Sequence, residues 1–398
     1  MKIVLLAPSD AYLFNFRGAL AASLHAAGHE VLMVAPPGPY ASKFKALGYR
    51  WCPAPMARAG MNPFKELWLI GWLYRFFRRE KVDLVHGFII KGAVYGALAG
   101  RLAGVPARVG SITGMGYLFL NDSIPSRVMR GLVRVLFRLA FTGDGVRVVV
   151  QNRDDLALFM NERLSRPEIM RMIPGSGVDC ELFAPLEGAD TPPERQTDVR
   201  AGRAFRVLLP ARLLWHKGLK PYADAARLLH ERDRRVSFLL AGEFDASNPS
   251  SINPATIQCW VREGLIEWLG YVDDMPELLR SVDVVVLPSF REGLPKALVE
   301  GAACALPLIT TDVPGCREVV ADNVDGLLVP AKNPEALAEA IRRLQNDPEL
   351  RLALGRAARK KSLARFDSRV IIRQTFELYA ELLPQFEDRP MRKATSVS

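Results

Sequence analysis

The chain has 398 residues, more than the roughly 100–200 of one ordinary domain, so we expect two domains. Hydrophobic residues at 49% and charged residues at 24% exclude a disordered or fibrous chain. Residues 1–150 hold 19 Lys and Arg against 7 Asp and Glu, which accounts for the whole net charge of +10. Such an excess indicates an anionic partner, namely nucleic acid, an acidic membrane surface or a phosphorylated substrate; a solvated basic face without a partner is the alternative.

The apolar stretches and the cysteines bear on cellular location. The longest apolar stretches, residues 64–77 and 131–141, are interrupted by charged side chains, so we expect no membrane-spanning helix. The start, MKIVLLAPSD, predicts a buried strand rather than a cleaved signal. The five cysteines have no metal-ligand spacing and indicate a reducing compartment. We therefore expect a cytoplasmic protein.

Short apolar runs alternate with helical stretches along the chain, which predicts βαβ units with buried parallel strands. The strands predicted in the first half are residues 3–7, 31–35, 84–86, 107–111 and 146–150, with helices that include 16–27 and 93–103. The strands predicted in the second half are residues 206–209, 236–241, 266–269, 282–287, 308–310 and 327–329, with helices at 222–231, 275–280, 297–304 and 334–346. The expected fold class is α/β, with two doubly wound domains.

The domain boundary falls in a segment without periodicity. Residues 186–204 contain Pro-Pro, Gly and alternating charges, which predicts a linker. We therefore expect an N-terminal domain over residues 1–185, a C-terminal domain over 205–368, and a helix over 369–383 that completes the N-terminal domain. The cleft between the carboxyl ends of the strands is the expected ligand site.

The segment LPSFREGLPKALVE, residues 287–300, carries the first chemical signal. A strand ends, a loop follows, and a helix begins near Pro295, where the free N–H groups and the positive end of the helix dipole suit a diphosphate. Gly293 permits a close backbone approach, and Glu292 and Glu300 could accept hydrogen bonds from sugar hydroxyls. The alternative is that Glu300 is an ordinary surface carboxylate.

The segment PARLLWHKG, residues 210–218, carries the second signal. It places Arg212 and Lys217 in the first strand-to-helix loop of the second half, where doubly wound folds bind phosphates. A guanidinium fork and an ammonium together can neutralise a pyrophosphate leaving group. A solvated basic loop is the alternative.

One set of residues carries a family resemblance: Arg212, Lys217 and Gly218, then Glu292, and Glu300 eight residues later. With these residues the chain resembles retaining glycosyltransferase family 4. The segment GSGVDCELFAP between the halves is part of the resemblance, which covers essentially the whole chain. It implies the GT-B fold, in which two Rossmann-like domains face each other across a cleft. Within the family, the chain is similar to bacterial enzymes that build surface polysaccharides and lipid-linked oligosaccharides, such as the α-1,3-N-acetylgalactosaminyltransferases.

The resemblance also implies roles for residues of the second domain. Arg212 and Lys217 would hold the diphosphate, Glu292 would contact the donor sugar, and Glu300 would contact the ribose. The backbone amides of Gly293 and Leu294 would bind phosphate or sugar.

In the first domain, the resemblance implies that Arg17 and Gly18 contribute to donor binding. It places Asn15, Arg17 and Gly18 in the loop after the first strand. The family's double-glycine loop is reduced here to Gly18. On the acceptor side, the candidates are Asn15, His86, Lys91 and Tyr117.

No metal or cofactor is expected. There is no Asp-X-Asp motif at a strand end, and Asp273 and Asp274 precede a helix that they are expected to cap. The resemblance implies a metal-independent, retaining transfer in which the leaving phosphate takes the proton of the acceptor. The protein then supplies positioning and electrostatic stabilisation.

Two helices predicted in the first half carry basic side chains beside aromatic and aliphatic ones. They cover residues 64–81 and 124–141. The second has four arginines at helical spacing: Arg127, Arg130, Arg134 and Arg138. This composition suits an interfacial helix on anionic lipid, and predicts a protein peripheral to the inner face of the cell membrane. The alternative is that Trp68, Leu69 and Trp72 are core residues. Nucleic acid is disfavoured, since no nucleic-acid-binding module is present.

The function predicted from these features is transfer of a hexose or N-acetylhexosamine from a UDP-sugar to a saccharide acceptor linked to undecaprenyl diphosphate. A UDP-sugar 2-epimerase shares the fold, but it would need no acceptor. A non-catalytic nucleotide- or lipid-binding relative is the third possibility, although Arg212, Lys217 and Glu292 are all retained.

Overall fold

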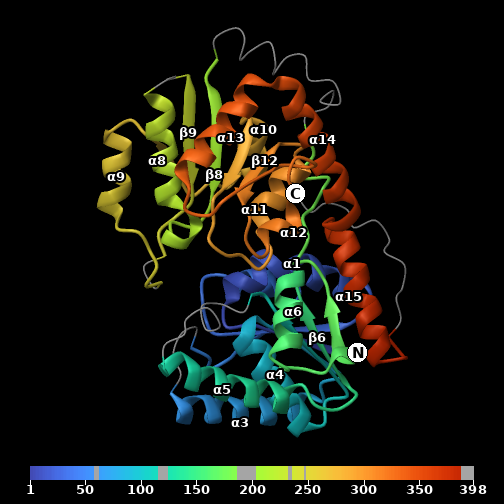
Figure 1. The fold of residues 1–398 in the computed structure, drawn as a ribbon. Coiled ribbons are helices and arrows are strands. Elements are labelled where there is room, and N and C mark those ends of the chain that lie inside the picture. The colour runs from blue at the N-terminus through green and yellow to red at the C-terminus, as the bar shows by residue number, and fades with distance from the viewer. Residues whose placement is uncertain (58–61, 115–123, 186–202, 232–234, 246–247, 387–398) are drawn as a thin grey trace. The chain divides into compact units, whose positions relative to one another are not determined.

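The computed structural model describes residues 1–57, 62–114, 124–185, 203–231, 235–245 and 248–386 (Figure 1). It forms two compact units, Met1–Ser176 with Ile371–Ser398, and Gly177–Val370. The chain first passes from one unit to the other at Gly177. Gly177 packs closely against Ser368 of the second unit, because a Cβ at Gly177 would lie 2.6 Å from the Ser368 Cα. Most of the predicted linker, residues 186–202, lies outside the described residues.

The first unit contains a parallel seven-stranded sheet in the order β3-β2-β1-β4-β5-β6-β7. Its strands are β1 (Lys2–Leu6), β2 (Glu30–Ala35), β3 (Arg50–Pro53), β4 (Leu84–Phe88), β5 (Ala107–Ile112), β6 (Val146–Val150) and β7 (Met170–Met172). The sequence analysis missed the two outermost strands. β3 and β7 are short, include Arg or Pro, and lack the long apolar run of a strand buried on both faces.

Helices cover both faces of this sheet. Along β1, Ile3 and Leu5 belong to one apolar cluster, whereas Val4 and Leu6 belong to another, as the two-residue period of a strand requires. The first cluster lies under α1 (Asp10–Ala26), α2 (Ala41–Ala46) and the later part of α15 (Ser368–Leu382). The other face is covered by α3 (Pro63–Glu80), α4 (Ile89–Ala103), α5 (Ile124–Ala140) and α6 (Arg153–Asn161).

The second unit contains a parallel six-stranded sheet in the order β10-β9-β8-β11-β12-β13. Its strands are β8 (Phe205–Pro210), β9 (Val236–Ala241), β10 (Glu267–Gly270), β11 (Val284–Leu287), β12 (Leu308–Thr311) and β13 (Leu327–Val329). Its helices are α8 (Leu219–His230), α9 (Pro254–Arg262), α10 (Met275–Arg280), α11 (Lys296–Ala303), α12 (Cys316–Val319), α13 (Pro334–Asn346) and α14 (Pro348–Arg365). Asp274 caps α10 as predicted, accepting a hydrogen bond from Glu277 N.

The strand orders confirm the predicted α/β class with two doubly wound sheets. In each sheet, the direction of winding reverses beside the first strand of the unit, between β1 and β4 and between β8 and β11. A crevice opens at the carboxyl ends of such strands, and ligands of doubly wound folds bind there. Within the described ranges, no helix has the length and apolar composition needed to cross a bilayer.

Candidate functional site

At the reversal point of the second unit, the loop after β8 meets the loop after β11. The β8 loop ends in a short 3-10 helix, Trp215–Lys217, and then in Gly218, whose φ is +80°. A Cβ at Gly218 would lie 2.0 Å from the Pro288 carbonyl oxygen, so a glycine is needed for the two loops to pack this closely.

Hydrogen bonds hold these two loops together. The His216 carbonyl accepts from Phe290 N at 2.9 Å and from the hydroxyl of Ser289 at 3.0 Å. Ser289 is fully buried, and its carbonyl in turn accepts a hydrogen bond from the Thr311 hydroxyl. Three successive strand ends are therefore joined at the reversal point.

The loop after β12 forms a third wall, which the sequence analysis did not identify. Glu292 N donates to the Pro314 carbonyl at 3.1 Å. Gly315 has a φ of +80°, and a Cβ there would lie 2.5 Å from the Glu292 carbonyl oxygen. The Val-Pro-Gly sequence at 313–315 signals a turn, but nothing local indicates that this turn packs against residue 292.

These loops bring Lys217 and Glu292 into direct contact. Lys217 Nζ donates to Glu292 Oε1 at 2.6 Å, and their side chains are only 16% and 10% exposed. Lys217 is thereby fixed at the carboxyl edge of the sheet. The sequence analysis expected both residues at the site, but not that they pair.

Glu300 lies on α11, close to Lys296. Lys296 Nζ is 3.2 Å from Glu300 Oε1, and the Glu300 side chain is 13% exposed. Burial raises the pKa of the Glu300 carboxyl, and Lys296 only partly offsets this effect. Glu300 is therefore a largely buried acceptor group and not the ordinary surface carboxylate of the alternative.

Arg212 remains half exposed at the same edge. Its Nη1 donates to Asp245 Oδ2 at 3.0 Å, and its side chain is 53% exposed. Asp245, which follows β9, therefore orients Arg212 while leaving much of the guanidinium open to a ligand. Asp245 was not a candidate in the sequence analysis, because one aspartate in a polar loop carries no signal.

Two other titratable groups at the site are neutral near pH 7. Burial and the Lys217 charge lower the pKa of His216 below its ordinary value. Burial and the Glu292 charge raise the pKa of the Cys316 thiol to about 12. His216 therefore adds no positive charge beside Lys217 and Arg212.

Gly293 and Leu294 lie in the turn that precedes α11, whose N-cap is Pro295. The Leu294 side chain packs against the core of the unit. This turn lies between Glu292 and the start of α11, where the resemblance placed backbone contacts to phosphate or sugar.

In the first unit, the predicted position of Asn15, Arg17 and Gly18 is wrong. They belong to α1 rather than to the loop after β1, because α1 already begins at Asp10. Ser9 caps this start by accepting a hydrogen bond from Tyr12 N.

Arg17 points into the unit from α1. It is 6% exposed, its Nη2 donates to the Tyr12 hydroxyl at 2.8 Å, and its Nη1 donates to the Gly175 carbonyl at 3.3 Å. Its guanidinium lies over the Phe88 ring, 4.3 Å from the ring centre. Within the described part of the chain, no carboxylate pairs with Arg17, and its Nε has no hydrogen-bond partner. Asn15 is exposed on the same helix.

His86 ends up in a buried chain of hydrogen bonds. Its Nε2 is 2.7 Å from Ser111 Oγ, and its Nδ1 is 2.6 Å from the hydroxyl of Tyr379 on α15. Burial and the nearby charge of Arg17 lower the pKa of His86 well below its ordinary value. His86 is therefore a neutral group that joins β4, β5 and α15.

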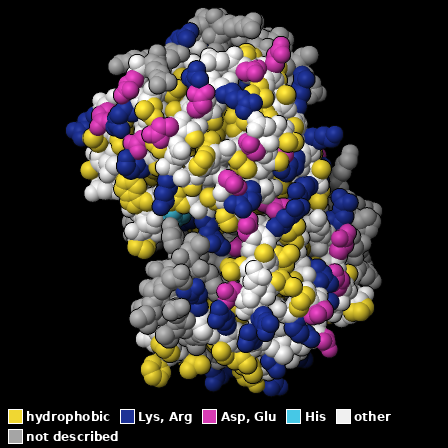
Figure 2. Space-filling model, viewed as in Figure 1, with side chains coloured by type: hydrophobic (Ala, Val, Ile, Leu, Met, Phe, Trp, Pro, Cys, Tyr) yellow, Lys and Arg dark blue, Asp and Glu magenta, His cyan; other side chains and the backbone are white. Residues whose placement is uncertain are grey.

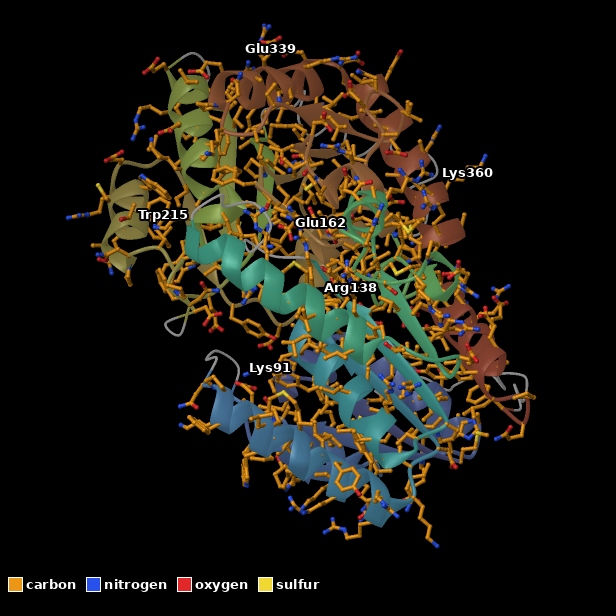
Figure 3. The ribbon with its side chains drawn as sticks, turned by 60° about the horizontal axis from the view of Figure 1, so that its bottom comes forward. Lys91, Arg138, Glu162, Trp215, Glu339 and Lys360 are labelled. Carbon is orange, nitrogen blue, oxygen red and sulfur yellow. The ribbon has the colours of Figure 1, made fainter. Side chains whose placement is uncertain are left out.

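Of the other acceptor-side candidates, Lys91 lies on α4. Lys91 Nζ donates to Glu66 Oε1 at 2.7 Å and to the Ala57 carbonyl at 3.0 Å, which ties α4 to α3 (Figure 3). Tyr117 lies outside the described residues. Among the residues that the structure describes, no group of three His, Cys, Asp or Glu side chains is arranged to hold a metal ion.

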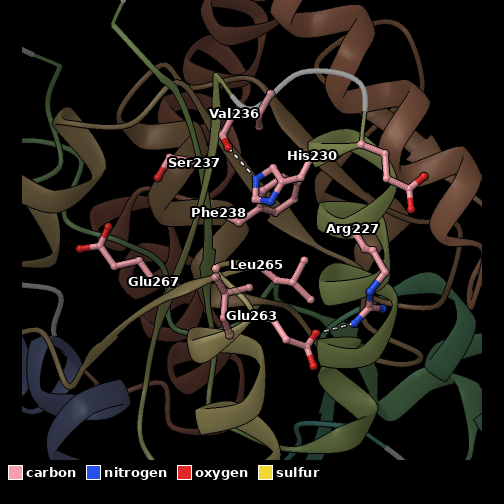
Figure 4. Close-up of a pocket in the computed structure, with 11 residues that line it drawn as sticks. Arg227, His230, Val236, Ser237, Phe238, Glu263, Leu265 and Glu267 are labelled. Carbon is pink, nitrogen blue, oxygen red and sulfur yellow. Dashed lines mark hydrogen bonds and ion pairs between the residues drawn. The ribbon is translucent and has the colours of Figure 1, made fainter.

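A separate hollow lies at the opposite edge of the second sheet, near the amino ends of β9 and β10 (Figure 4). Two of the polar side chains that line it are already engaged: Arg227 pairs with Glu263 at 2.8 Å, and His230 Nε2 lies 2.9 Å from the Val236 carbonyl oxygen. We therefore place the candidate site at the reversal point.

Both units match known families. Residues 16–175 match the family described as "Glycosyl transferase 4-like domain", and residues 190–361 match "Glycosyl transferases group 1". The chain belongs to the glycosyltransferases that combine these two domains. This finding favours the transferase over the 2-epimerase and over a non-catalytic relative.

Two curated relatives and one solved structure extend the match over the whole chain. The N,N'-diacetylbacillosaminyl-diphospho-undecaprenol alpha-1,3-N-acetylgalactosaminyltransferase of Campylobacter jejuni is 28% identical over 384 residues, 96% of this chain and 99% of that protein. The UDP-Gal:alpha-D-GlcNAc-diphosphoundecaprenol alpha-1,3-galactosyltransferase of Escherichia coli is 26% identical over 78% of each chain. The crystal structure of Anabaena Alr3699/HepE in complex with UDP has a TM-score of 0.75 at 20% identity, covering 96% of this chain and 100% of the other. The chain has the predicted GT-B fold.

Proposed function

We propose that the chain transfers a hexose or N-acetylhexosamine from a UDP-sugar to a saccharide linked to undecaprenyl diphosphate. The observation that carries the proposal is the cluster of Lys217, Arg212, Glu292 and Glu300 at the reversal point of the second sheet. It combines two cations suited to a diphosphate with two carboxylates suited to hydroxyl groups. Both curated relatives are named as transferases acting on undecaprenyl diphosphate-linked saccharides, which supports the acceptor class.

In this proposal, Lys217 and Arg212 bind the diphosphate and stabilise the charge that develops as it leaves. Glu292 holds Lys217 and contacts the donor sugar, Glu300 accepts hydrogen bonds from the ribose hydroxyls, and the amides of Gly293 and Leu294 bind phosphate or sugar. Lys217 and Glu292 are fixed before the reaction by the contacts among the three loops, and Asp245 orients Arg212. Preorganised charge of this kind contributes more than charge that must reorient.

Arg17 supplies a further cation from the first unit. Its charge has no carboxylate partner in the described ranges, so an anionic donor phosphate near α1 would offset the cost of burying it. Gly18 follows it on α1 and has open space where a Cβ would be. On the acceptor side, we retain Asn15, Lys91 and Tyr117. We propose that His86 acts only by positioning α15 and β5, since both of its ring nitrogens are engaged.

We infer that the transfer retains the anomeric configuration and needs no metal. The acceptor hydroxyl oxygen bonds to the anomeric carbon as the bond from that carbon to the diphosphate breaks, and the departing phosphate oxygen takes the acceptor proton. UDP leaves with both electrons of the broken bond. Lys217 and Arg212 neutralise it in the role that a divalent cation has in other transferases.

The acceptor lipid implies that the enzyme works at the inner face of the cell membrane. The basic excess of residues 1–150 supports attraction to an anionic lipid surface. The partners proposed are thus a nucleotide sugar, a lipid-linked saccharide and an anionic membrane.

The test is a screen of UDP-sugars against undecaprenyl diphosphate-linked saccharides, with mass and anomeric analysis of the products. One donor should extend one acceptor by a single sugar with retained configuration. Conversion of a UDP-sugar to its 2-epimer without any acceptor would contradict the proposal and favour the epimerase.

A further inference from the structure

Helix α3 has one face in the core of the first unit and an opposite face in solvent. Leu69, Leu73, Phe76 and Phe77 are all buried against the strands of the sheet. The residues half a turn away from them are exposed. The exposed face is not uniform along the helix.

The first two turns of this face are apolar. Phe64, Leu67 and Trp68 are 82%, 67% and 59% exposed. Residues at spacings of three and four lie side by side on a helix, so these three side chains form one patch. In the view of Figure 1, α3 follows the lower edge of the first unit, and Figure 2 shows hydrophobic side chains at that edge. This arrangement excludes Trp68 from the core role that the sequence analysis left open, whereas Leu69 has that role.

The following turns of the same face are basic. Arg75, Arg78 and Arg79 are exposed, but Arg79 Nε lies 3.3 Å from Glu80 Oε1 and is already paired. Arg75 bonds only to the Gly71 carbonyl and Arg78 to the Tyr74 hydroxyl, so neither has a carboxylate partner among the described residues. Exposed arginines without such partners are available to anionic groups.

Helix α5, where the sequence analysis placed the basic stripe, offers less free charge. Arg134 pairs with Glu162, whereas Arg138 is exposed and, like Arg75, donates to a backbone carbonyl, that of Arg163 at 3.0 Å (Figure 3). The Arg127 side chain lies outside the described residues. α3 is therefore the better-supported contact element.

We propose that α3 docks the first unit on an anionic bilayer. Phe64, Leu67 and Trp68 enter the boundary between head groups and acyl chains, and Arg75 and Arg78 contact lipid phosphates. An apolar patch continued by arginines matches such a surface. A second copy of the chain would meet it with the same positive charge, which disfavours self-association through α3.

The N-terminal end of α3, which carries the apolar patch, also contacts Lys91, one of the proposed acceptor-side residues. On the inner side of its first turns, Glu66 holds Lys91 of α4 at 2.7 Å. Docking through this end would bring Lys91 to the level of the lipid head groups, where the diphosphate of a membrane-anchored acceptor lies. This step rests on the proposed function, whereas docking itself does not.

Co-sedimentation with vesicles tests the docking. The wild type should bind phosphatidylglycerol–phosphatidylcholine vesicles and bind phosphatidylcholine alone weakly. Phe64→Ser/Leu67→Ser/Trp68→Ser should weaken binding at least about tenfold, because the buried apolar area is lost. Arg75→Glu/Arg78→Glu should weaken it by more than about tenfold and flatten its salt dependence.

Matched variants in the second unit control for surface apolarity and net charge. Val261→Ser/Val324→Ser/Leu363→Ser removes three exposed apolar side chains there, and Arg356→Glu/Lys360→Glu makes the same charge change on α14. Both should bind like the wild type. Equal loss in controls and α3 variants, or no loss in the α3 variants, would overturn the proposal, as would a wild-type dimer that the serine variant converts to monomer.

Transfer to a short-chain, water-soluble acceptor separates this proposal from the proposed function. Folded α3 variants should retain that activity. Its loss would show that the α3 face serves the active site and would overturn docking. Absence of transfer in every variant, together with the expected vesicle binding, would contradict the proposed function and leave docking supported.

Discussion

Lys217 Nζ donates to Glu292 Oε1 at 2.6 Å, joining two loops that follow adjacent strands at the reversal point of the second sheet. Both side chains are mostly buried, so the ammonium is held in place rather than free in solvent. A diphosphate entering this edge would meet a cation whose position is already fixed. In our proposal, Glu292 therefore acts on the diphosphate through Lys217, in addition to contacting the donor sugar.

Removing Lys217 should slow the chemical step. We expect Lys217→Ala to lower kcat about 100-fold or more, the usual cost of losing one donor that stabilises charge in the transition state. Steady-state kinetics with a fixed acceptor measures this change. Lys220→Ala is the matched control, since Lys220 pairs with Asp224 on the exposed side of α8 and should leave kcat unchanged. An unaltered kcat in folded Lys217→Ala would remove Lys217 from catalysis.

Glu300 should make UDP binding sensitive to pH. A hydrogen bond to a charged acceptor contributes about 1.5–3 kcal/mol, so Glu300→Gln should weaken UDP binding roughly 10–100-fold. The pKa of Glu300 is raised by burial, and its ionised form is the acceptor; affinity should therefore fall as the pH drops through that raised pKa, at a higher pH than for an ordinary glutamate. Calorimetric titration across the acidic range measures both effects. Equal affinity and equal pH dependence in the two proteins would place Glu300 outside the donor site.

Gly218 should be intolerant of a side chain. Gly218→Ala places a Cβ 2.0 Å from the Pro288 carbonyl oxygen and should displace the loop that carries Lys217. We expect UDP affinity to fall more than about tenfold, the scale of 1–3 kcal/mol for a strained residue. Gly264→Ala is the control, because Gly264 also has a positive φ, +69°, but has no atom within 4 Å of its Cβ position. Gly264→Ala should leave UDP affinity unchanged, and an equally unchanged affinity in folded Gly218→Ala would contradict the role of the contact between the two loops.

His86 should stabilise the first unit without titrating. His86→Leu leaves the hydroxyls of Ser111 and Tyr379 without this partner and should lower the free energy of unfolding by about 2–4 kcal/mol. The pKa of His86 is lowered in the folded state, so below about pH 6.5 the unfolded chain binds a proton that the folded chain does not. The His86 contribution is therefore present at neutral pH and is lost as the pH falls below that value.

Urea denaturation at several pH values measures this contribution as the difference between the wild type and His86→Leu. Tyr379→Phe is the milder control, because it removes only one hydroxyl. A difference that grows toward acidic pH would contradict the neutral His86.

Chelation should not affect transfer. Lys217 and Arg212 supply the positive charge for the diphosphate in our proposal, so a molar excess of EDTA should leave the initial rate unchanged. Loss of activity that Mg²⁺ or Mn²⁺ restores would refute metal independence.

Much of the fold follows from local sequence, because buried parallel strands are continuous apolar runs and helices alternate with them. The loops after β8 and β11 could be placed at one edge for the same reason. The contact between these loops could not be predicted, because the pairing of Lys217 with Glu292 depends on tertiary packing. Gly218 is the one local indication of that packing. The position of Gly315 against Glu292 has no local signal.

In the first unit, sequence reasoning failed at the start of one helix and at contacts between residues far apart in the chain. The Ser9 cap starts α1 early enough to include Arg17, although the resemblance placed that residue in a loop. The partner of His86, Tyr379, lies nearly three hundred residues away on α15, beyond any pattern argument. The pairing of Arg134 with Glu162 likewise depends on how α5 lies against the end of α6.

A coupled transfer assay tests the central claim most directly. UDP-sugar is incubated with an undecaprenyl diphosphate-linked saccharide, and UDP release and acceptor extension are followed together in the wild type and in Lys217→Ala. The account predicts one added sugar for each UDP released in the wild type and at least about a 100-fold slower reaction in the variant. Release of UDP without acceptor extension in every donor–acceptor pair, or equal rates in the two proteins, would contradict it.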